Sequence, residues 1–207
     1  MASKPLLAAV LLAGGASRRF GADNKLLVEV DGVPMVQRVA REILAAGVDE
    51  IVVVTGAEHE AYLKALADVP VRFVQNLDWD AGIGSSIAVG VRALSEAPQG
   101  VFIVPGDLPN LGADMFRRLA AAFAEAGGHR AVLPVTERGE QRNPVLWPRS
   151  LFPKLAALSG SKGGKSLLDT LGDQRVDVAF GDESVFADID TQDDYARLIA
   201  GARGDAH

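Results

Sequence analysis

The sequence contains no cysteine and only three histidines among its 207 residues. Without cysteine the chain can form no disulfide, thiolate zinc site or cysteine nucleophile. The histidines, His59, His129 and His207, lie far from one another in the sequence. Neither a histidine metal site nor a histidine-based catalytic triad is expected. Carboxylates, basic side chains and backbone groups are therefore the candidate functional groups.

The chain also lacks an excess of positive charge and a long apolar run. It carries 27 acidic and 21 basic residues, for a formal net charge of −6, whereas a dedicated nucleic-acid binder is usually basic. No segment approaches the roughly 20 apolar residues of a membrane span. The apolar start is short and runs into Gly14-Gly15 rather than into a signal-peptide cleavage site. The sequence predicts a cytoplasmic protein that binds neither nucleic acid nor membranes.

Apolar runs alternate with segments of helical periodicity along the first two thirds of the chain. Buried strands are predicted at 6–12, 51–54, 71–74, 101–104 and 131–135, and helices at 35–44, 85–94 and 114–127. Continuous apolar strands separated by amphipathic helices indicate βαβ units, with a parallel sheet covered on both faces. Because 48% of the residues are hydrophobic, a sizeable core is available to such an α/β fold.

The last third of the chain is less regular. An extended segment is predicted at 143–147, short helices at 151–158 and 165–171, and a strand at 175–180. A final helix is predicted at 191–200, with Thr191 as its cap and Asp194 in its first turn. With no internal repeat and no low-complexity linker, residues 1–207 are predicted to form a single domain.

The stretch 12–25 leaves the first predicted strand and combines several glycines with Arg18, Arg19 and Lys25. Glycine lets the backbone approach a ligand so that its N–H groups can point at phosphate oxygens. Arginine matches phosphate oxygens in a bidentate manner. On the residues alone, a phosphate-binding loop and an ordinary strand exit with a solvated basic face both fit.

The two standard phosphate-binding signatures do not fit this chain. The Walker A motif needs a glycine where Ser159 stands before 164–166, and no strong strand precedes it. The dinucleotide fingerprint begins at 82–84, but Ile87 occupies the position of its last glycine.

At the first loop the sequence resembles a known family. Leu-Ala-Gly-Gly-x-Ser-x-Arg-x-Gly, starting at Leu12 and followed by Lys25, is similar to the signature of the molybdenum-cofactor nucleotidyltransferases. Further motifs of that family follow in order: Asn-x-x-Trp-x-x-Gly-x-x-Ser-Ser-Ile at 76–87, Gly-Asp-Leu-Pro at 106–109, Asn-Pro-Val-Leu-Trp at 143–147, Gly-Ser-Lys-Gly-Gly-Lys at 160–165 and Asp-Ile-Asp-Thr-x-x-Asp at 188–194. Each motif is weak alone, but their shared order spans almost the whole chain.

The resemblance implies a three-layer, Rossmann-like nucleotidyltransferase fold with a mostly parallel twisted sheet and helices on both faces. It implies that the N-terminal half binds a nucleoside triphosphate and the C-terminal half binds the acceptor. The nucleotide-binding residues it implies are Leu12, Ala13, Gly14, Gly15, Arg19, Lys25, Asn76, Gly82 and Ser85. The acceptor-side residues it implies are Asn143, Lys162 and Lys165.

Two aspartates are candidates for a magnesium site. Asp107 follows the strand at 101–104, at the edge where open α/β sheets bind ligands. Asp190 precedes the last predicted helix, and magnesium prefers a few carboxylates together with phosphate oxygens and water. On the residues alone, a turn aspartate and a neighbour of a helix cap fit equally well. The resemblance implies that both bind Mg²⁺, with Asp188 as the neighbour that would share or replace the role of Asp190.

The implied reaction is attack by an acceptor phosphate on the α-phosphorus of the triphosphate, with release of pyrophosphate. Asp107 would hold the metal, while Arg19 and Lys25 would hold the β- and γ-phosphates and stabilise the leaving group. Positioning and charge neutralisation dominate such transfers, and no protein nucleophile is required. The implied partners are a nucleoside triphosphate, a molybdopterin-type phosphorylated acceptor and a molybdenum-dependent target enzyme.

The second half of the chain resembles the cytidylyltransferase branch, which predicts transfer of CMP from CTP to molybdopterin. The first loop reads Ala13-Gly14-Gly15, a double glycine more typical of the guanylyl branch. Asn143 stands where many relatives carry histidine, and Ser161 where an aspartate is usual. The alternatives are guanylyl transfer, transfer to a sugar phosphate, and a non-catalytic chaperone that holds the molybdenum cofactor.

Overall fold

The computed structural model describes residues 4–15, 20 and 24–204 of the chain. In this part, a mixed sheet of seven strands runs in the order β5-β4-β1-β6-β8-β7-β9. The strands are β1 (Leu7–Ala13), β4 (Glu50–Thr55), β5 (Arg72–Gln75), β6 (Gly100–Pro105), β7 (Ala131–Val135), β8 (Val145–Pro148) and β9 (Arg175–Ala179). Neighbouring strands are parallel except for β8, which is antiparallel to both β6 and β7.

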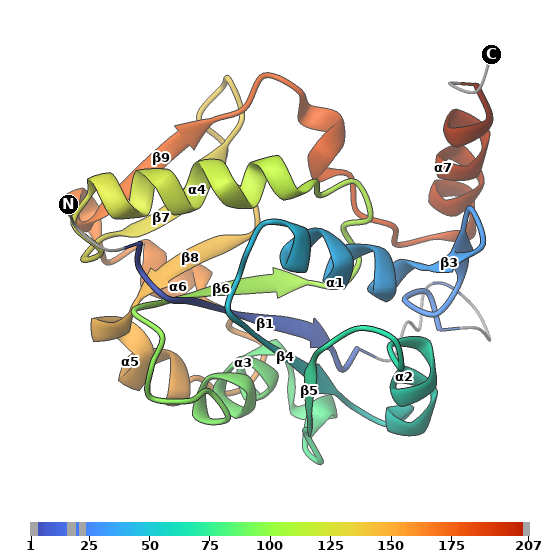
Figure 1. The fold of residues 1–207 in the computed structure, drawn as a ribbon, viewed down its shortest axis with the longest axis horizontal. Coiled ribbons are helices and arrows are strands. Elements are labelled where there is room, and N and C mark those ends of the chain that lie inside the picture. The colour runs from blue at the N-terminus through green and yellow to red at the C-terminus, as the bar shows by residue number, and fades with distance from the viewer. Residues whose placement is uncertain (1–3, 16–19, 21–23, 205–207) are drawn as a thin grey trace.

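Helices cover both faces of the sheet and give three layers. Figure 1 shows α1 and α4 on one side and α3 and α5 on the other. The helices are α1 (Met35–Ala45), α2 (His59–Ala65), α3 (Ile83–Arg92), α4 (Ala113–Glu125), α5 (Phe152–Ala156), α6 (Lys165–Leu168) and α7 (Gln192–Gly204). This arrangement confirms the predicted three-layer α/β fold with a mostly parallel sheet.

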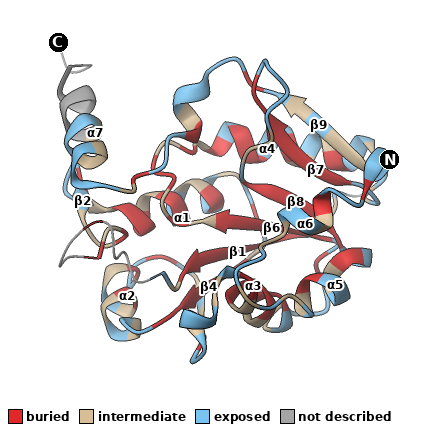
Figure 2. Ribbon diagram, turned by 180° about the vertical axis from the view of Figure 1, so that it is seen from behind, coloured by how far each residue is buried: buried red, intermediate tan, exposed pale blue. Residues whose placement is uncertain are grey.

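The central strand β1 explains why the sequence reads as a continuous apolar run. Leu7, Ala9 and Leu11 join the apolar cluster that includes α1 and α4, whereas Val10 and Leu12 join the cluster that includes α3 and α5. All seven residues of β1 are buried, and Figure 2 shows buried residues filling the middle layer. A strand covered on both faces has no solvated side and needs no polar alternation.

Several predicted elements need correction. The helix expected at 85–94 begins two residues earlier, at Ile83, with Gly82 as its N-cap, so Ser85 and Ser86 lie in its first turn. The extended segment at 143–147 becomes an antiparallel strand that starts at Val145. Helix α2 and the short hairpin of β2 (Glu29–Val30) and β3 (Val33–Pro34) had no counterpart in the prediction.

The carboxyl ends of β1 and β6 lie side by side because the two strands are parallel neighbours. In Figure 1 both arrowheads point toward the side of the molecule where α2 and α7 lie. The N–H of Gly106 donates to the carbonyl oxygen of Leu12 at 3.1 Å, which ties the loop after β6 to the end of β1. No helix in the described ranges combines the length and apolar character needed to cross a membrane.

Candidate functional site

A cavity of about 440 Å³ opens at the carboxyl ends of β1 and β6. We call it the central cavity. Seven of the predicted site residues line it: Leu12, Gly14, Gly15, Lys25, Gly82, Asp107 and Asp190. Trp79, Asp80, Ile83, Leu26, Ser86, Pro105 and Gly106 complete its lining. Residues from five separate stretches of sequence therefore meet at one edge of the sheet, as expected for an open α/β fold.

Lys25 joins the two predicted metal ligands. Its Nζ lies 2.8 Å from Asp107 Oδ2 and 2.8 Å from Asp190 Oδ1. The three side chains are only 14%, 25% and 26% exposed, respectively. Burial lowers the pKa of Lys25, but hydrogen bonds and charges from Asp107 and Asp190 outweigh it and raise the pKa overall. The ammonium group therefore stays charged between two carboxylates.

Asp190 is positioned by the cap of α7. Asp194 Oδ2 accepts hydrogen bonds from the backbone N–H of Thr191 at 2.8 Å and of Asp190 at 3.2 Å. The Thr191 hydroxyl donates to the same oxygen at 2.7 Å, and the Asp194 N–H reaches Thr191 Oγ1 at 3.2 Å. The hydrogen bonds from Thr191 hold the pKa of Asp194 below its usual value. This reciprocal capping box confirms the predicted cap and fixes the backbone beside the metal-site candidate.

Helix α7 also contacts the first loop. Gln192 Nε2 donates to the carbonyl oxygen of Phe20 at 3.0 Å, and the Phe20 ring packs edge-on against Tyr195 with centroids 6.0 Å apart. The Tyr195 hydroxyl donates to the carbonyl oxygen of Glu29 at 2.6 Å. Figure 1 shows α7 beside β3 at this end of the molecule. The C-terminal segment thus supports Asp190 and contacts Phe20.

Asn76 and Ser85, two of the predicted nucleotide-binding residues, are not among the residues that line the central cavity. Asn76 is 2% exposed, and its Nδ2 donates to Ser85 Oγ at 2.9 Å and to Ser86 Oγ at 3.0 Å. Ser85 Oγ donates to the carbonyl oxygen of Gly82 at 2.8 Å. Of these side chains, Ser86 lines the cavity. Asn76 and Ser85 therefore stabilise the loop at 76–86 through hydrogen bonds of their side chains.

Gly82 joins this loop to the acceptor-side segment. Its φ of +114° is rarely adopted by other residues, and a Cβ there would lie 2.5 Å from the carbonyl oxygen of Gly160. The N–H of Gly84 donates to the same oxygen at 2.9 Å. Glycine is required at 82 both by the backbone angle and by the close approach of the two segments.

A smaller cavity of about 90 Å³, here called the inner pocket, extends the central cavity. Gly14, Gly15 and Trp79 are common to both, and Ala13, Asn24, Ala57, Glu58 and Tyr62 complete the inner pocket. Asn24 Nδ2 donates to Glu58 Oε1 at 3.1 Å and lies 2.9 Å from the Tyr62 hydroxyl. Burial raises the pKa of Tyr62, so its hydroxyl stays protonated. Sequence reasoning missed Glu58 and Tyr62 because no helix was predicted at α2.

A third cavity of about 600 Å³, here called the acceptor-side cavity, shares Leu12, Ile83 and Pro105 with the central cavity. Asn143, Arg142 and Lys165 contribute polar groups, and the buried Trp147 contributes an apolar wall. Ile87, Ile103, Glu140, Gln141, Val145, Gly163, Gly164, Leu168 and Asp169 complete the lining. Lys162 is exposed and is not among these residues, so of the three acceptor-side candidates Asn143 and Lys165 are the two that reach the cavity.

Two further predicted site residues are Arg19 and Asp188. Arg19 lies outside the described residues. Asp188 is exposed, and in the described ranges no hydrogen bond or ion pair joins it to Lys25, which contacts Asp190 instead. The geometry therefore favours Asp190 over Asp188 as the partner of Asp107.

The donor set suits a magnesium ion. Asp107 and Asp190 already converge on one cation, the ammonium group of Lys25, at the wall of the central cavity. Within the described residues, no cluster of three or more acidic or histidine side chains forms a complete cage for a metal. Magnesium commonly uses one or two carboxylates and takes its other ligands from phosphates and water. Two carboxylates at the wall of the central cavity fit that preference.

The fold and these joined cavities define an α/β protein of the nucleotidyltransferase class. Residues 9–176 match the family described as the MobA-like NTP transferase domain, and the chain belongs to this family. A molybdenum cofactor guanylyltransferase from Burkholderia vietnamiensis is 31% identical over 200 residues, covering 94% of this chain and 96% of its own length. A nicotine blue oxidoreductase from Paenarthrobacter nicotinovorans is 29% identical over 206 residues, covering 94% and 97%. The structure of a nucleotidyl transferase from Methanothermobacter thermautotroptrophicus superimposes with a TM-score of 0.79 at 25% identity, covering 96% and 99%.

Proposed function

We propose that this protein transfers a nucleoside monophosphate from a nucleoside triphosphate to the phosphate of a molybdopterin-type acceptor, releasing pyrophosphate. The observation that carries the proposal is the Lys25–Asp107–Asp190 cluster, which lies in the central cavity between the inner pocket and the acceptor-side cavity. In this proposal the inner pocket would take the base, the central cavity the triphosphate with its metal, and the acceptor-side cavity the acceptor.

The residues of the central cavity position the triphosphate. Backbone groups at 13–15 would face the base and phosphates, and Lys25, with Arg19, would hold the β- and γ-phosphates. Asp107 and Asp190 would hold Mg²⁺, whose chemistry is to neutralise charge on the phosphates. An acceptor phosphate oxygen forms the new bond to the α-phosphorus. The bond from the α-phosphorus to the bridging oxygen breaks, and its electron pair leaves with pyrophosphate, which Lys25 stabilises.

The acceptor-side cavity suits a flat anionic heterocycle. Ile83, Ile87 and Trp147 provide apolar walls. Lys165 and Arg142 provide positive charge, although Arg142 is ion-paired with Glu140 and Asp169 also lines the cavity. A sugar phosphate would leave most of these apolar walls without a matching surface. The guanylyltransferase name of the Burkholderia relative adds support for molybdopterin as the acceptor. A molybdenum-dependent enzyme that receives the product is part of the same proposal.

For the nucleotide, the cytidylyl-like second half of the sequence predicts CTP, whereas two observations favour GTP. Curated relatives of the chain are named guanylyltransferases. In addition, the Glu58 carboxylate lines the inner pocket, where its Oε1 accepts a hydrogen bond from Asn24. Guanine presents two adjacent N–H donors to a carboxylate, whereas cytosine places its N3 acceptor beside its amino group and would be repelled. We therefore propose GTP as the preferred donor.

The Lys25–Asp107–Asp190 cluster favours transfer over the redox activity stated in the name of the Paenarthrobacter relative. Holding phosphates and a metal requires these charges, and moving electrons does not. It also favours an enzyme over a non-catalytic chaperone, which would need to grip the cofactor but not to stabilise a leaving pyrophosphate.

The test is pyrophosphate release measured with GTP, CTP, ATP and UTP in turn, each with molybdopterin and Mg²⁺. The proposal expects release that depends on molybdopterin and is fastest with GTP. Faster release with CTP would restore the cytidylyl prediction. No release with any triphosphate, together with tight binding of molybdopterin, would favour the chaperone.

A further inference from the structure

Lys25 occupies the place between the two carboxylates that a divalent cation would take. Its Nζ is 2.8 Å from an oxygen of Asp107 and 2.8 Å from an oxygen of Asp190. The two aspartates come from loops far apart in the sequence, and both contact one ammonium group. The contact is shielded, because the Lys25 side chain is 14% exposed.

Two carboxylates that share one partner repel each other when that partner is removed, and the repulsion grows as water is excluded. A cation between them therefore stabilises the pair of carboxylates whether or not ligands are bound. Lys25 supplies that cation with a single positive charge, in a protein whose formal net charge is −6. A divalent ion approaching the same oxygens meets this charge at close range and must displace it.

We propose that Lys25 is the resident counter-ion of the metal site and is exchanged for the divalent cation when the nucleotide binds. The inference rests on the proposed function, since it takes Asp107 and Asp190 as metal ligands. A triphosphate offers the displaced ammonium group a new anionic partner in the same cavity, which free metal does not. Metal and triphosphate therefore bind with positive coupling, and metal alone binds weakly.

The exchange gives Lys25 one role without ligands and another with the nucleotide bound. Without ligands, Lys25 keeps the loops that carry Asp107 and Asp190 together, so the metal ligands are preorganised before the metal arrives. With the nucleotide, the same ammonium group moves toward the phosphates that are to leave. One side chain thus links assembly of the metal site to the presence of substrate.

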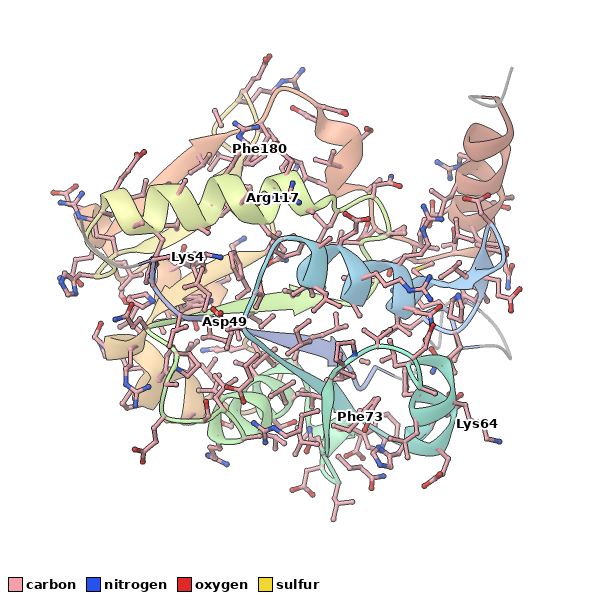
Figure 3. The ribbon with its side chains drawn as sticks, viewed as in Figure 1. Lys4, Asp49, Lys64, Phe73, Arg117 and Phe180 are labelled. Carbon is pink, nitrogen blue, oxygen red and sulfur yellow. The ribbon has the colours of Figure 1, made fainter. Side chains whose placement is uncertain are left out.

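The experiment measures Mn²⁺ binding by electron paramagnetic resonance, without nucleotide, in the full chain and in Lys25→Met, which removes the charge and keeps most of the side-chain volume. We expect Lys25→Met to bind Mn²⁺ at least about tenfold more tightly than the parent. Lys64→Met is the matched control for net charge, because Lys64 is exposed on α2 and points away from the body of the molecule (Figure 3). This control should bind Mn²⁺ as the parent does.

A double variant separates this inference from the proposed function. Adding Asp107→Asn to Lys25→Met should abolish the gain in Mn²⁺ affinity. If Lys25→Met binds no more tightly than the parent while Asp107→Asn still weakens Mn²⁺ binding with GTP present, the counter-ion role is wrong and the metal site stands. If Asp107→Asn changes Mn²⁺ binding in neither background, the proposed metal site itself is wrong.

Folding of Lys25→Met provides a second readout. Loss of the counter-ion should lower its melting temperature, and Mn²⁺ should restore that temperature while leaving the parent almost unchanged. Should the variant be unfolded without metal, Mn²⁺ is expected to induce folding, as followed by circular dichroism. A melting temperature that Mn²⁺ does not raise would overturn the inference.

Discussion

The backbone N–H of Ile189 donates a hydrogen bond to the carbonyl oxygen of Asp107 at 3.1 Å. This bond joins the loop after β6 to the segment before α7, and each segment carries one of the two candidate metal ligands. Ile189 is buried at 3% exposure and belongs to the apolar cluster beneath α1 and α4. The position of Asp190 relative to Asp107 is therefore set by backbone and core contacts, in addition to the ion pairs with Lys25.

Asp194→Ala should impair the site without touching a substrate. Removing its carboxylate leaves the N–H groups of Asp190 and Thr191 without their acceptor and weakens the start of α7. We expect a lower melting temperature and slower nucleotidyl transfer, with weaker binding of Mn²⁺ in the presence of GTP. Asp193→Ala is the control, since Asp193 is exposed in the same first turn. Equal effects of the two substitutions would contradict the positioning role of Asp194.

Glu58→Gln should change which nucleotide is preferred. The substitution keeps an oxygen for Asn24 but removes the charge that would accept two N–H groups of guanine. Binding of GTP should weaken by roughly 10- to 100-fold, the usual value of a charge-assisted hydrogen bond. The affinity for inosine triphosphate, which lacks the 2-amino group, should fall by a smaller factor.

Titration calorimetry with GTP, inosine triphosphate and CTP checks the role of Glu58. Glu60→Gln, an exposed substitution in the first turn of α2, provides the control. If Glu58→Gln weakened all three nucleotides equally, Glu58 would have no part in recognising the base.

Gly164→Ala should weaken binding of the acceptor and leave binding of the nucleotide unchanged. A Cβ at 164 would lie 2.7 Å from Cζ2 of Trp147, so the indole must move within the acceptor-side cavity. Overpacking of this kind typically costs about 1–3 kcal/mol of stability. The KM for molybdopterin should rise while the KM for GTP stays unchanged. Gly112→Ala is the control, because a Cβ at 112 would meet nothing within 4 Å and Gly112 does not line the acceptor-side cavity. An unchanged KM for molybdopterin in Gly164→Ala would contradict this placement of the acceptor.

Glu50 should make a pH-dependent contribution to the free energy of unfolding. Burial of its carboxyl raises the pKa, but hydrogen bonds from Ser95 and Arg72 outweigh burial and hold it below the usual 4.5. A lowered pKa means that the stabilisation is complete above the usual value and is lost as the pH falls through the folded-state pKa. Glu50→Gln should therefore cost about 1 kcal/mol at neutral pH, and the difference from the parent should shrink as the pH falls below 4.5.

Urea unfolding across this pH range measures the contribution of Glu50. Glu96→Gln, next to Ser95 and exposed, controls for the change in net charge. A stability difference between Glu50→Gln and the parent that stays constant from neutral to acid pH would show that the Glu50 charge has no such role.

The sequence was sufficient to predict the layers of the fold because its central strands are apolar on both faces. Strand β7 was predicted at its observed bounds, Ala131–Val135, and the cap at Thr191 followed from a short local pattern. The antiparallel direction of β8 could not be predicted from the sequence, because strand direction depends on which strands become neighbours. Helix α2 was missed because its seven residues bury only one side chain, that of Tyr62, and carry little apolar periodicity.

The candidate site was predictable where glycines and carboxylates follow strands. Leu12, Gly14, Lys25, Asp107 and Asp190 all reach the central cavity as expected. The inner pocket was not predictable, because its polar wall is made by contacts across the fold between the first loop and α2. The same holds for the contact of one lysine with two aspartates, which depends on three loops meeting at a single point.

Mass spectrometry of the product formed from GTP, molybdopterin and Mg²⁺ tests the proposed nucleotidyl transfer most directly. We expect a new species with the mass of molybdopterin plus guanosine monophosphate less water, formed together with pyrophosphate. In Asp107→Asn its rate of formation should fall by a factor of about 100 to 1000. Absence of any nucleotide-linked product, or its formation by Asp107→Asn at the rate of the parent, would contradict it.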